Sequence, residues 1–189
     1  MHCLMCGSFS LLHICKTCQI EELEPSLYIT YIDDVKVLSF YTYDKIKILL
    51  HTKHTDIGYY ILNILASIAM KKFAMNFEYT SKIAVVGIDD HNGHGYSHTA
   101  ILVKFLKSKV LIPHFNILRS QSTYSYSSKT VKQRESNPRN FIYHDIKLNE
   151  IILIDDIITT GKTLQEAMLL LKQNNKKVLF CVTLAKAKL

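Results

Sequence analysis

Residues 151–163 read IILIDDIITTGKT and are the most informative part of the chain, because they join an apolar run, an acidic pair and a hydroxyl-rich turn. The apolar residues 151–154 are typical of a short strand buried on both faces of a parallel sheet. Asp155 and Asp156 follow where we expect that strand to emerge. Residues 159–163 then combine three threonines with a glycine and a lysine at the expected start of a helix. The stretch therefore predicts a strand, a tight turn and a helix.

The predicted turn has the donors that a phosphate group needs. A helix N-terminus presents backbone N–H groups and the positive end of the helix dipole. A glycine lets the backbone come close to a ligand, and threonine hydroxyls donate hydrogen bonds to phosphate oxygens. The residues that we expect to hold a phosphate are Thr159, Thr160, Gly161, Lys162 and Thr163.

The acidic pair suits a sugar next to that phosphate. Carboxylates accept hydrogen bonds from vicinal hydroxyls, and we expect Asp155 and Asp156 on the same side of the turn. Together with the phosphate cradle, they predict a site for a phosphorylated ribose. The alternative is a capped helix beside a chance acidic pair. The GxxxxGK[ST] loop and the dinucleotide glycine fingerprint are both absent.

The rest of the chain alternates between strand-like and helix-like segments. We expect strands at 35–43, 83–88, 109–118, 141–146, 150–157 and 177–185, and helices at 45–50, 56–73, 99–108 and 163–173. Asp44 and Asp56 stand where they would cap helices, and Pro113 limits its strand to an edge or a bend. The helix at 56–73 is apolar nearly all round, which predicts burial. The alternation predicts an α/β fold, with a mostly parallel sheet flanked by helices and a ligand at the C-terminal strand ends.

Four of the five cysteines lie within the first 18 residues. They form two Cys-x2-Cys pairs separated by eight residues, Cys3 with Cys6 and Cys15 with Cys18. Two such pairs complete a tetrahedral four-cysteine site of the kind that holds structural Zn²⁺. Unligated cysteines or a redox role for one pair are the alternatives. We expect a small zinc module at residues 1–24 and a second domain at 25–189.

Composition indicates a globular chain with an anionic partner. Hydrophobic residues make up 48% and charged residues 21%, which is enough apolar matter for one sizeable core. The formal net charge of +7 favours a phosphorylated ligand or nucleic acid, although a generally lysine-rich surface would also explain it. The most apolar stretch, 57–70, is shorter than the roughly 20 residues that a membrane span needs. With no visible secretion signal, we expect a cytoplasmic protein without a membrane span.

The polar segment 120–140 lacks a core-forming pattern and interleaves tyrosines with cations. It is predicted to be a flap over the ligand or a surface for single-stranded nucleic acid, which binds through base stacking and phosphate contacts. A basic loop with no partner is the alternative. The candidate residues are Tyr124, Tyr126, Lys129, Lys132, Arg134 and Arg139.

The run at 151–163 resembles the ligand-binding motif of type I phosphoribosyltransferases, which bind 5-phosphoribosyl-1-pyrophosphate (PRPP). The resemblance implies that Asp155 and Asp156 hold the ribose hydroxyls and that residues 159–163 hold the 5′-phosphate. It also implies that Mg²⁺ accompanies PRPP.

A zinc knuckle before such a domain resembles the ComF family, which serves in natural transformation. Lys53 stands where that family has a lysine-containing turn, and Arg134 matches a family arginine. Residues 85–98 stand where the family has a P-V-P…R-G-F-N-Q loop. There Gly95 and Tyr96 keep the glycine and aromatic positions, whereas the arginine, asparagine and glutamine positions hold His94, Ser97 and His98. This departure weakens the expectation of efficient pyrophosphate release.

Two functions follow from the resemblance and the basic segment. One is a PRPP-binding protein of DNA uptake that handles incoming single-stranded DNA in the cytoplasm, with peripheral contact at the inner face of the membrane left open. Its expected partners include other competence proteins, such as a DNA-translocating helicase or a membrane channel. The other is an active phosphoribosyltransferase of nucleotide salvage or synthesis.

Overall fold

One mixed sheet organises the chain. The computed structural model describes residues 1–89, 96–121 and 140–187. Within them, seven strands form a sheet of order β1-β2-β7-β6-β3-β4-β5. The strands are β1 (Tyr28–Ile32), β2 (Val35–Thr42), β3 (Ile83–Asp89), β4 (Leu111–Ser120), β5 (Phe141–Tyr143), β6 (Glu150–Ile158) and β7 (Lys177–Lys186). The five inner strands are parallel, and the edge strands β1 and β5 are antiparallel to their neighbours. The predicted α/β fold with a mostly parallel sheet is confirmed.

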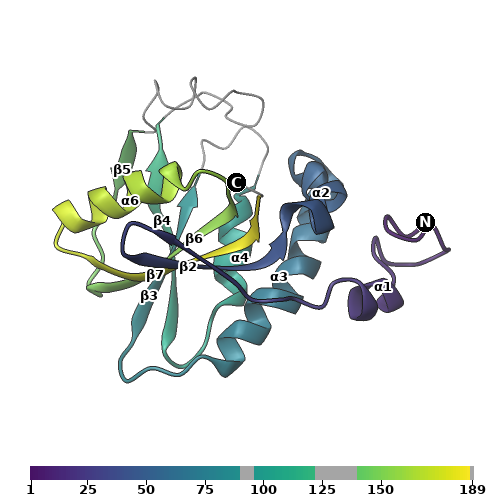
Figure 1. The fold of residues 1–189 in the computed structure, drawn as a ribbon, viewed down its shortest axis with the longest axis horizontal. Coiled ribbons are helices and arrows are strands. Elements are labelled where there is room, and N and C mark those ends of the chain that lie inside the picture. Colours follow the sequence, from purple (N-terminus) through teal and green to yellow (C-terminus); the bar gives the residue numbers. More distant parts are fainter. Residues whose placement is uncertain (90–95, 122–139, 188–189) are drawn as a thin grey trace.

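Helices cover both faces of this sheet (Figure 1). They are α1 (Lys16–Glu21), α2 (Tyr43–His51), the 3-10 helix η1 (Thr52–His54), α3 (Asp56–Asn76), α4 (His98–Phe105) and α6 (Lys162–Gln173). Buried residues of α2, α3 and α4 form one core cluster with the sheet, and those of α6 form the other. Among the described helices, none is long and apolar enough to cross a membrane.

The apolar runs in the sequence become strands buried on both faces. All seven residues of β3 are buried. In β6, Ile152 and Ile154 pack in the cluster of α3 and α4, whereas Ile151 and Leu153 pack in the cluster of α6. Each side chain of the run therefore has an apolar layer to enter, which explains why the sequence is continuous rather than alternating.

Two helices begin differently from the prediction. Helix α3 is capped by Thr55, whose side-chain oxygen accepts from the Gly58 N–H at 3.3 Å, so that Asp56 lies in the first turn instead. Helix α2 begins at Tyr43, which places Asp44 in its first turn. A carboxylate there still interacts favourably with the helix dipole. Nor is α3 buried all round, since its apolar residues Ile57, Tyr59, Tyr60 and Met75 are exposed.

Strands β1 and β5 form the two edges of the sheet. Strand β1 was not predicted, and it joins β2 through a hairpin in which Asp33 adopts a positive φ of 49°. Aspartate tolerates this left-handed conformation better than most residues. On β4, Pro113 pairs with Val85 of β3, while β5 reaches only as far as Leu118 on the other side. The flank of β4 beside Pro113 thus has no described partner strand, as an edge position requires.

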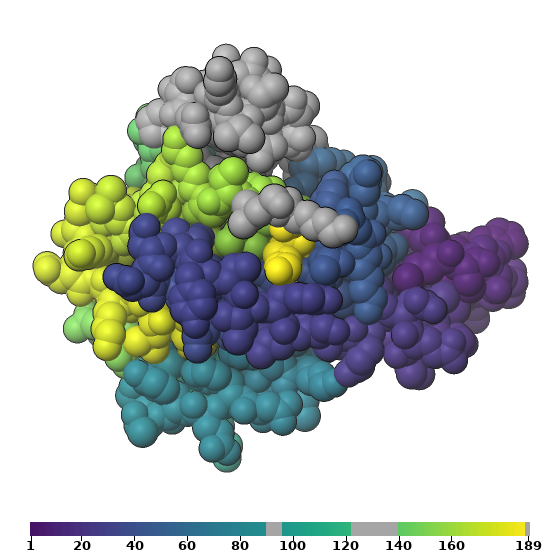
Figure 2. Space-filling model, in the orientation of Figure 1, coloured from purple at the N-terminus to yellow at the C-terminus, as the bar shows by residue number. Residues whose placement is uncertain are grey.

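The N-terminal residues pack onto the same core as α3. Cys3, Ile14, Cys18 and Leu23 are buried in that cluster, and the Tyr41 hydroxyl donates to the Leu23 carbonyl at 2.7 Å. In Figure 2 the N-terminal segment, in purple, forms a lobe at one end of the molecule. The lobe is thus attached through apolar contacts and not only by the chain.

The turn between β6 and α6 depends on Gly161. This residue is the N-cap of α6 and has a φ of 78°, in the left-handed region. A Cβ atom at this position would lie 2.6 Å from Cδ1 of Ile32 at the end of β1. Backbone conformation and close packing both require glycine here.

Replacing Gly161 with alanine should therefore destabilise the protein. We expect Gly161→Ala to lower the free energy of unfolding by about 1–2 kcal/mol from the left-handed conformation alone, with a further loss from the contact with Ile32. Chemical denaturation of Gly161→Ala, Ile32→Ala and the double variant measures both parts. The penalty of Gly161→Ala should be smaller when Ile32 is alanine, and strictly additive effects would contradict the packing explanation.

Candidate functional site

The candidate site lies at the C-terminal ends of β3 and β6, where parallel sheets bind ligands. Asp155 and Asp156 lie within β6 and not after it, because β6 stays paired with β7 as far as Ile158. Both carboxylates therefore have strand geometry, and β6 ends at Ile158, one residue beyond the predicted strand 150–157.

The turn after β6 has the form of an anion-binding cradle. Gly161 caps α6 without a side-chain hydrogen bond, and the first N–H groups of a helix have no acceptor within the helix itself. Thr159 and Thr160 are exposed beside them, and Thr163 is half-buried in the first turn of α6. The structure brings together the residues that the sequence predicted for the phosphate.

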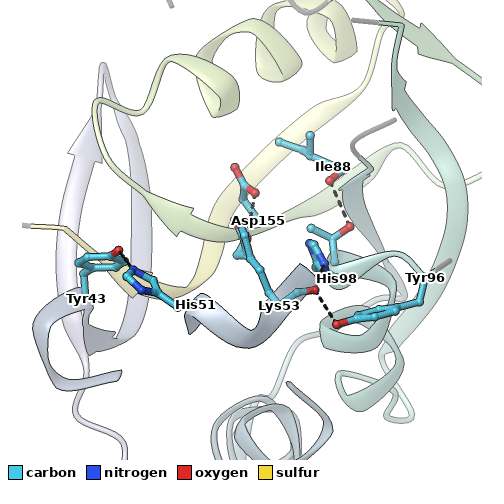
Figure 3. Close-up of polar contacts among 9 residues, drawn as sticks. Tyr43, His51, Lys53, Ile88, Tyr96, His98 and Asp155 are labelled. Carbon is cyan, nitrogen blue, oxygen red and sulfur yellow. Dashed lines mark hydrogen bonds and ion pairs between the residues drawn. The ribbon is translucent and has the colours of Figure 1, made fainter. Parts of the chain in front are cut away.

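The two carboxylates have different surroundings, so the expectation that they share one side is wrong. Successive side chains of a strand point to opposite faces. A carboxylate oxygen of Asp155 accepts from the backbone N–H of Asp156 at 2.8 Å. Oδ2 of Asp156 instead accepts from the Lys53 ammonium at 2.7 Å. In Figure 3, Asp155 points toward α6, whereas Lys53 and His98 lie on the other side of the strand.

The ion pair keeps Asp156 charged in a largely buried position. The side chains of Lys53 and Asp156 are only 19% and 16% exposed. Burial alone would raise the pKa of Asp156, but the charge and hydrogen bond of Lys53 outweigh it, and the pKa is lowered. His98 adds a smaller contribution in the same direction.

The turn that carries Lys53 is held from two sides. The carbonyl oxygen of Lys53 accepts from the Tyr96 hydroxyl at 2.6 Å and is 2.7 Å from Nε2 of His98 (Figure 3). On the other side, a Cβ atom at Gly58 would lie 2.1 Å from the Thr52 carbonyl oxygen, so glycine permits the turn to rest on α3. These contacts fix the backbone of Lys53.

A buried carboxylate lies at the C-terminal end of β3, the strand next to β6. Asp89, at the end of β3, is 5% exposed and accepts hydrogen bonds from the hydroxyls of Ser97 and Thr99, the latter at 2.9 Å. Ser97 also caps α4 by accepting from the Ala100 N–H. The segment 90–95, with His91, His94 and Gly95, lies outside the described residues, and the residues that flank it, Asp89 and Tyr96, are held at the site by hydrogen bonds.

Sequence reasoning did not place Lys53, Tyr96 or His98 in the site. Lys53 and Asp156 are 103 positions apart in the chain, and no local pattern links them. Their only signal was the resemblance of their segments to a known family. The predicted flap or nucleic-acid residues, Tyr124, Tyr126, Lys129, Lys132, Arg134 and Arg139, lie outside the described part of the chain.

The four N-terminal cysteines form one cluster. The sulfur atoms of Cys3, Cys6, Cys15 and Cys18 all lie within 4.8 Å of one another, and those of Cys6 and Cys15 are 3.8 Å apart. Zinc–sulfur bonds of about 2.3 Å in a tetrahedron place sulfurs about 3.8 Å apart. The cluster is therefore compatible with structural zinc.

Backbone donors support the sulfur cluster. Burial opposes ionisation of Cys3, but hydrogen bonds from the N–H groups of Cys15, Cys6 and Met5 lower its pKa to about 6. The pKa of Cys18 is raised, first by its hydrogen bond with the Cys15 sulfur and then by burial. Four thiolates this close together need a cation to compensate their charge.

Comparison with known proteins agrees with this architecture. Residues 61–188 match the phosphoribosyl transferase domain family. Competence protein F of Haemophilus influenzae is 33% identical over 86 residues, which cover 42% of this chain and 38% of that protein. The chain thus matches less than half the length of this relative.

Two crystal forms of a hypoxanthine phosphoribosyltransferase from Staphylococcus aureus are also similar. One has a TM-score of 0.40 and 18% identity, covering 66% of this chain and 62% of that chain. The other has a TM-score of 0.42 and 17% identity, covering 68% and 66%. Because the family match spans more than half of the chain, this protein belongs to the phosphoribosyl transferase domain family, and its resemblance to competence protein F is confirmed.

Proposed function

We propose that the protein binds PRPP and acts in DNA uptake, where it handles single-stranded DNA. The observation that carries the PRPP part is the junction of β6 and α6, where two carboxylates precede a glycine-capped helix N-terminus. In this proposal Thr159, Thr160, Gly161, Lys162 and Thr163 bind the 5′-phosphate. Asp155 and Asp156 accept hydrogen bonds from the ribose hydroxyls.

Magnesium fits the proposed ligand. Phosphate, hydroxyl and water oxygens are among the hard ligands that Mg²⁺ takes, and PRPP would bring the phosphate and hydroxyl oxygens to the end of β6 where Asp155 and Asp156 lie. When bound, the ion would neutralise part of the diphosphate charge. The chain's own part is to orient the ribose between the strand end and the turn.

The DNA part rests on charge and on the relative's name. A net charge of +7 favours anionic partners, and the matching relative is named a competence protein. The segment with Tyr124, Tyr126, Lys129, Lys132 and Arg134 has the mixture of aromatic and basic residues that binds single strands.

The second candidate, an active phosphoribosyltransferase, is favoured by the family match itself. In that reaction a nitrogen nucleophile bonds to C1 of the ribose while the C1–oxygen bond to pyrophosphate breaks. The binding function is preferred because His94, Ser97 and His98 replace the arginine, asparagine and glutamine of the related loop.

The double variant Asp155→Asn with Asp156→Asn tests the PRPP site. Each lost hydrogen bond to a charged acceptor is worth about 1.5–3 kcal/mol, so we expect PRPP affinity to fall by roughly a hundredfold or more, as measured by titration calorimetry with Mg²⁺. The control Glu21→Gln with Glu78→Gln removes two exposed carboxylates outside the site and should bind normally. Unchanged PRPP affinity in a folded Asp155/Asp156 variant would reject the assignment.

The zinc module is tested by metal content. We expect about one Zn²⁺ per chain in the wild type and its loss in Cys3→Ser with Cys15→Ser, because two of the four thiolate ligands disappear. Cys181→Ser is the matched control, since Cys181 is buried on β7 and takes no part in the cluster. Equal zinc content in all three proteins would show that the cysteines serve another purpose.

Two assays on one preparation separate the two functions. We expect single-stranded oligonucleotides to bind with an affinity that falls as the salt concentration rises. The reason is that lysine and arginine side chains release counterions from the phosphates when they bind, and added salt opposes this release. We expect no release of pyrophosphate at enzymatic rates from PRPP, Mg²⁺ and a panel of bases. Turnover would establish the transferase, and salt-independent or absent DNA binding would remove the DNA role.

A further inference from the structure

Strand β1 leaves one edge of the sheet unpaired. It is the first strand in the order of the sheet, and no strand pairs with its outer side among the described residues. Residues 28–32 read YITYI, with neither a charged residue nor a proline. In Figure 2 the segment that contains β1, in dark indigo, lies open on the face toward the viewer. Natural sheets usually protect such an edge with charges, prolines or a covering segment, so a bare apolar edge strand indicates an interaction surface.

The side chains of β1 lie on two faces. Ile32 packs in the core cluster of α6, and Tyr28 and Thr30 share its face because strand residues alternate. Ile29 and Tyr31 lie on the other face, where they are 49% and 63% exposed. Two large apolar side chains at an open edge would be covered by a neighbouring strand.

Thr30 indicates what that neighbouring strand carries. Its Oγ1 is buried and has no hydrogen-bond partner within the described residues, which is unfavourable for a hydroxyl. A rotation of the side chain from one staggered position to another would turn this hydroxyl toward the open edge. Threonines that lie opposite each other on adjacent strands form hydrogen bonds. Thr30 therefore favours a second threonine beside it.

A second copy of β1 supplies that threonine. When two β1 strands pair antiparallel about a two-fold axis at Thr30, each Thr30 lies opposite the other. Ile29 of one copy then lies opposite Tyr31 of the second copy, and aromatic and β-branched residues are favourable cross-strand neighbours. The strand is thus complementary to itself, as an interface with two-fold symmetry requires.

Charges at the two ends of β1 agree with this pairing. The Lys186 ammonium lies over the Tyr28 ring, 5.3 Å from its centroid. The pairing sets Tyr28 opposite Ile32 of the second copy, so that Asp33 of that copy follows directly. A cation at one end of the strand therefore comes close to a carboxylate at the other end, and the symmetry repeats the pair.

We propose that β1 is a dimerisation strand, which pairs antiparallel with β1 of a second copy and joins the two sheets into one. The proposed interface adjoins the candidate site. A Cβ atom at Gly161 would meet Ile32 at the end of β1, and Asp33 accepts from the Gln165 side chain of α6 at 3.1 Å. The proposal is independent of which ligand the site binds.

Charged substitutions test the pairing through the dimer dissociation constant, measured by sedimentation equilibrium. We expect the wild type to show a monomer–dimer equilibrium. Ile29→Glu with Tyr31→Glu sets like charges opposite each other and should weaken the dimer by about tenfold or more. Ile29→Lys with Tyr31→Glu sets opposite charges there and should dimerise about tenfold or more tightly than the double-glutamate variant.

The matched control changes exposed apolar residues elsewhere. Ile48→Glu with Leu169→Glu alters α2 and α6, where both side chains are exposed, and should dimerise as wild type. Ile29 and Tyr31 are exposed as well, so we expect their variants to keep the fold, which circular dichroism verifies.

Cysteine cross-linking tests the register separately. In the zinc-loaded protein, Thr30→Cys should form an intermolecular disulfide with oxidised glutathione, because Cβ atoms of directly opposed residues lie about 4.5–5.5 Å apart. Ile29→Cys should cross-link much more slowly although it is more exposed, because position 29 lies opposite position 31 and not opposite itself.

The contradicting results are distinct. A wild type that stays monomeric at every concentration would overturn the proposal and leave the β1 edge to a different protein. A dimer that the double-glutamate variant leaves unchanged, or that both charged variants weaken equally, would place the interface elsewhere and overturn it too. Equal cross-linking of Thr30→Cys and Ile29→Cys would reject the proposed pairing.

Discussion

The pairing of β6 with β3 on one side and β7 on the other determines where the candidate site lies. These hydrogen bonds hold residues 151–154 between two apolar layers and continue along β7 as far as Ile158. The acidic pair is thereby fixed at the end of a rigid strand, and the α6 turn follows immediately. A shift of one residue in this register would exchange the surroundings of Asp155 and Asp156.

Contacts between residues far apart in the sequence complete the candidate site at the end of β6. The Lys53 turn reaches Asp156 from between α2 and α3, and Tyr96 and His98 hold that turn from the start of α4. The hydroxyl of Tyr96 makes a bond that a phenylalanine would not make, so the aromatic position of the related loop has a polar role here. Asp89 ties the same α4 region back to β3 through Ser97 and Thr99. Three segments distant in sequence are thus bound together at one strand end.

The parts of this structure that local patterns control were predictable. The inner strands, the glycine-capped start of α6 and the cysteine cluster follow from apolar runs, turn residues and ligand spacing within short windows. Strand β1 was missed although residues 28–32, YITYI, are all β-branched or aromatic and therefore favour a strand. The orientation of Asp155 and Asp156 was mistaken because both lie within β6, where successive side chains point to opposite faces of the sheet.

What could not be predicted depends on tertiary contacts. Nothing near Lys53 in the sequence indicates that it meets a carboxylate 103 positions away. Similarly, Thr55 rather than Asp56 caps α3 because its extended backbone directs its hydroxyl at the Gly58 N–H. The choice between neighbouring capping residues is decided by backbone geometry, which the two side chains alone do not reveal.

We expect the turn between β6 and α6 to bind the phosphate of PRPP. Backbone amide resonances during a PRPP titration test it most directly, because a phosphate at a helix N-terminus perturbs the N–H groups that bind it. We expect the largest shifts on residues 159–163 and no change in the amides of residues 1–24. Saturating PRPP that leaves residues 159–163 unmoved, or shifts only residues elsewhere, would contradict it.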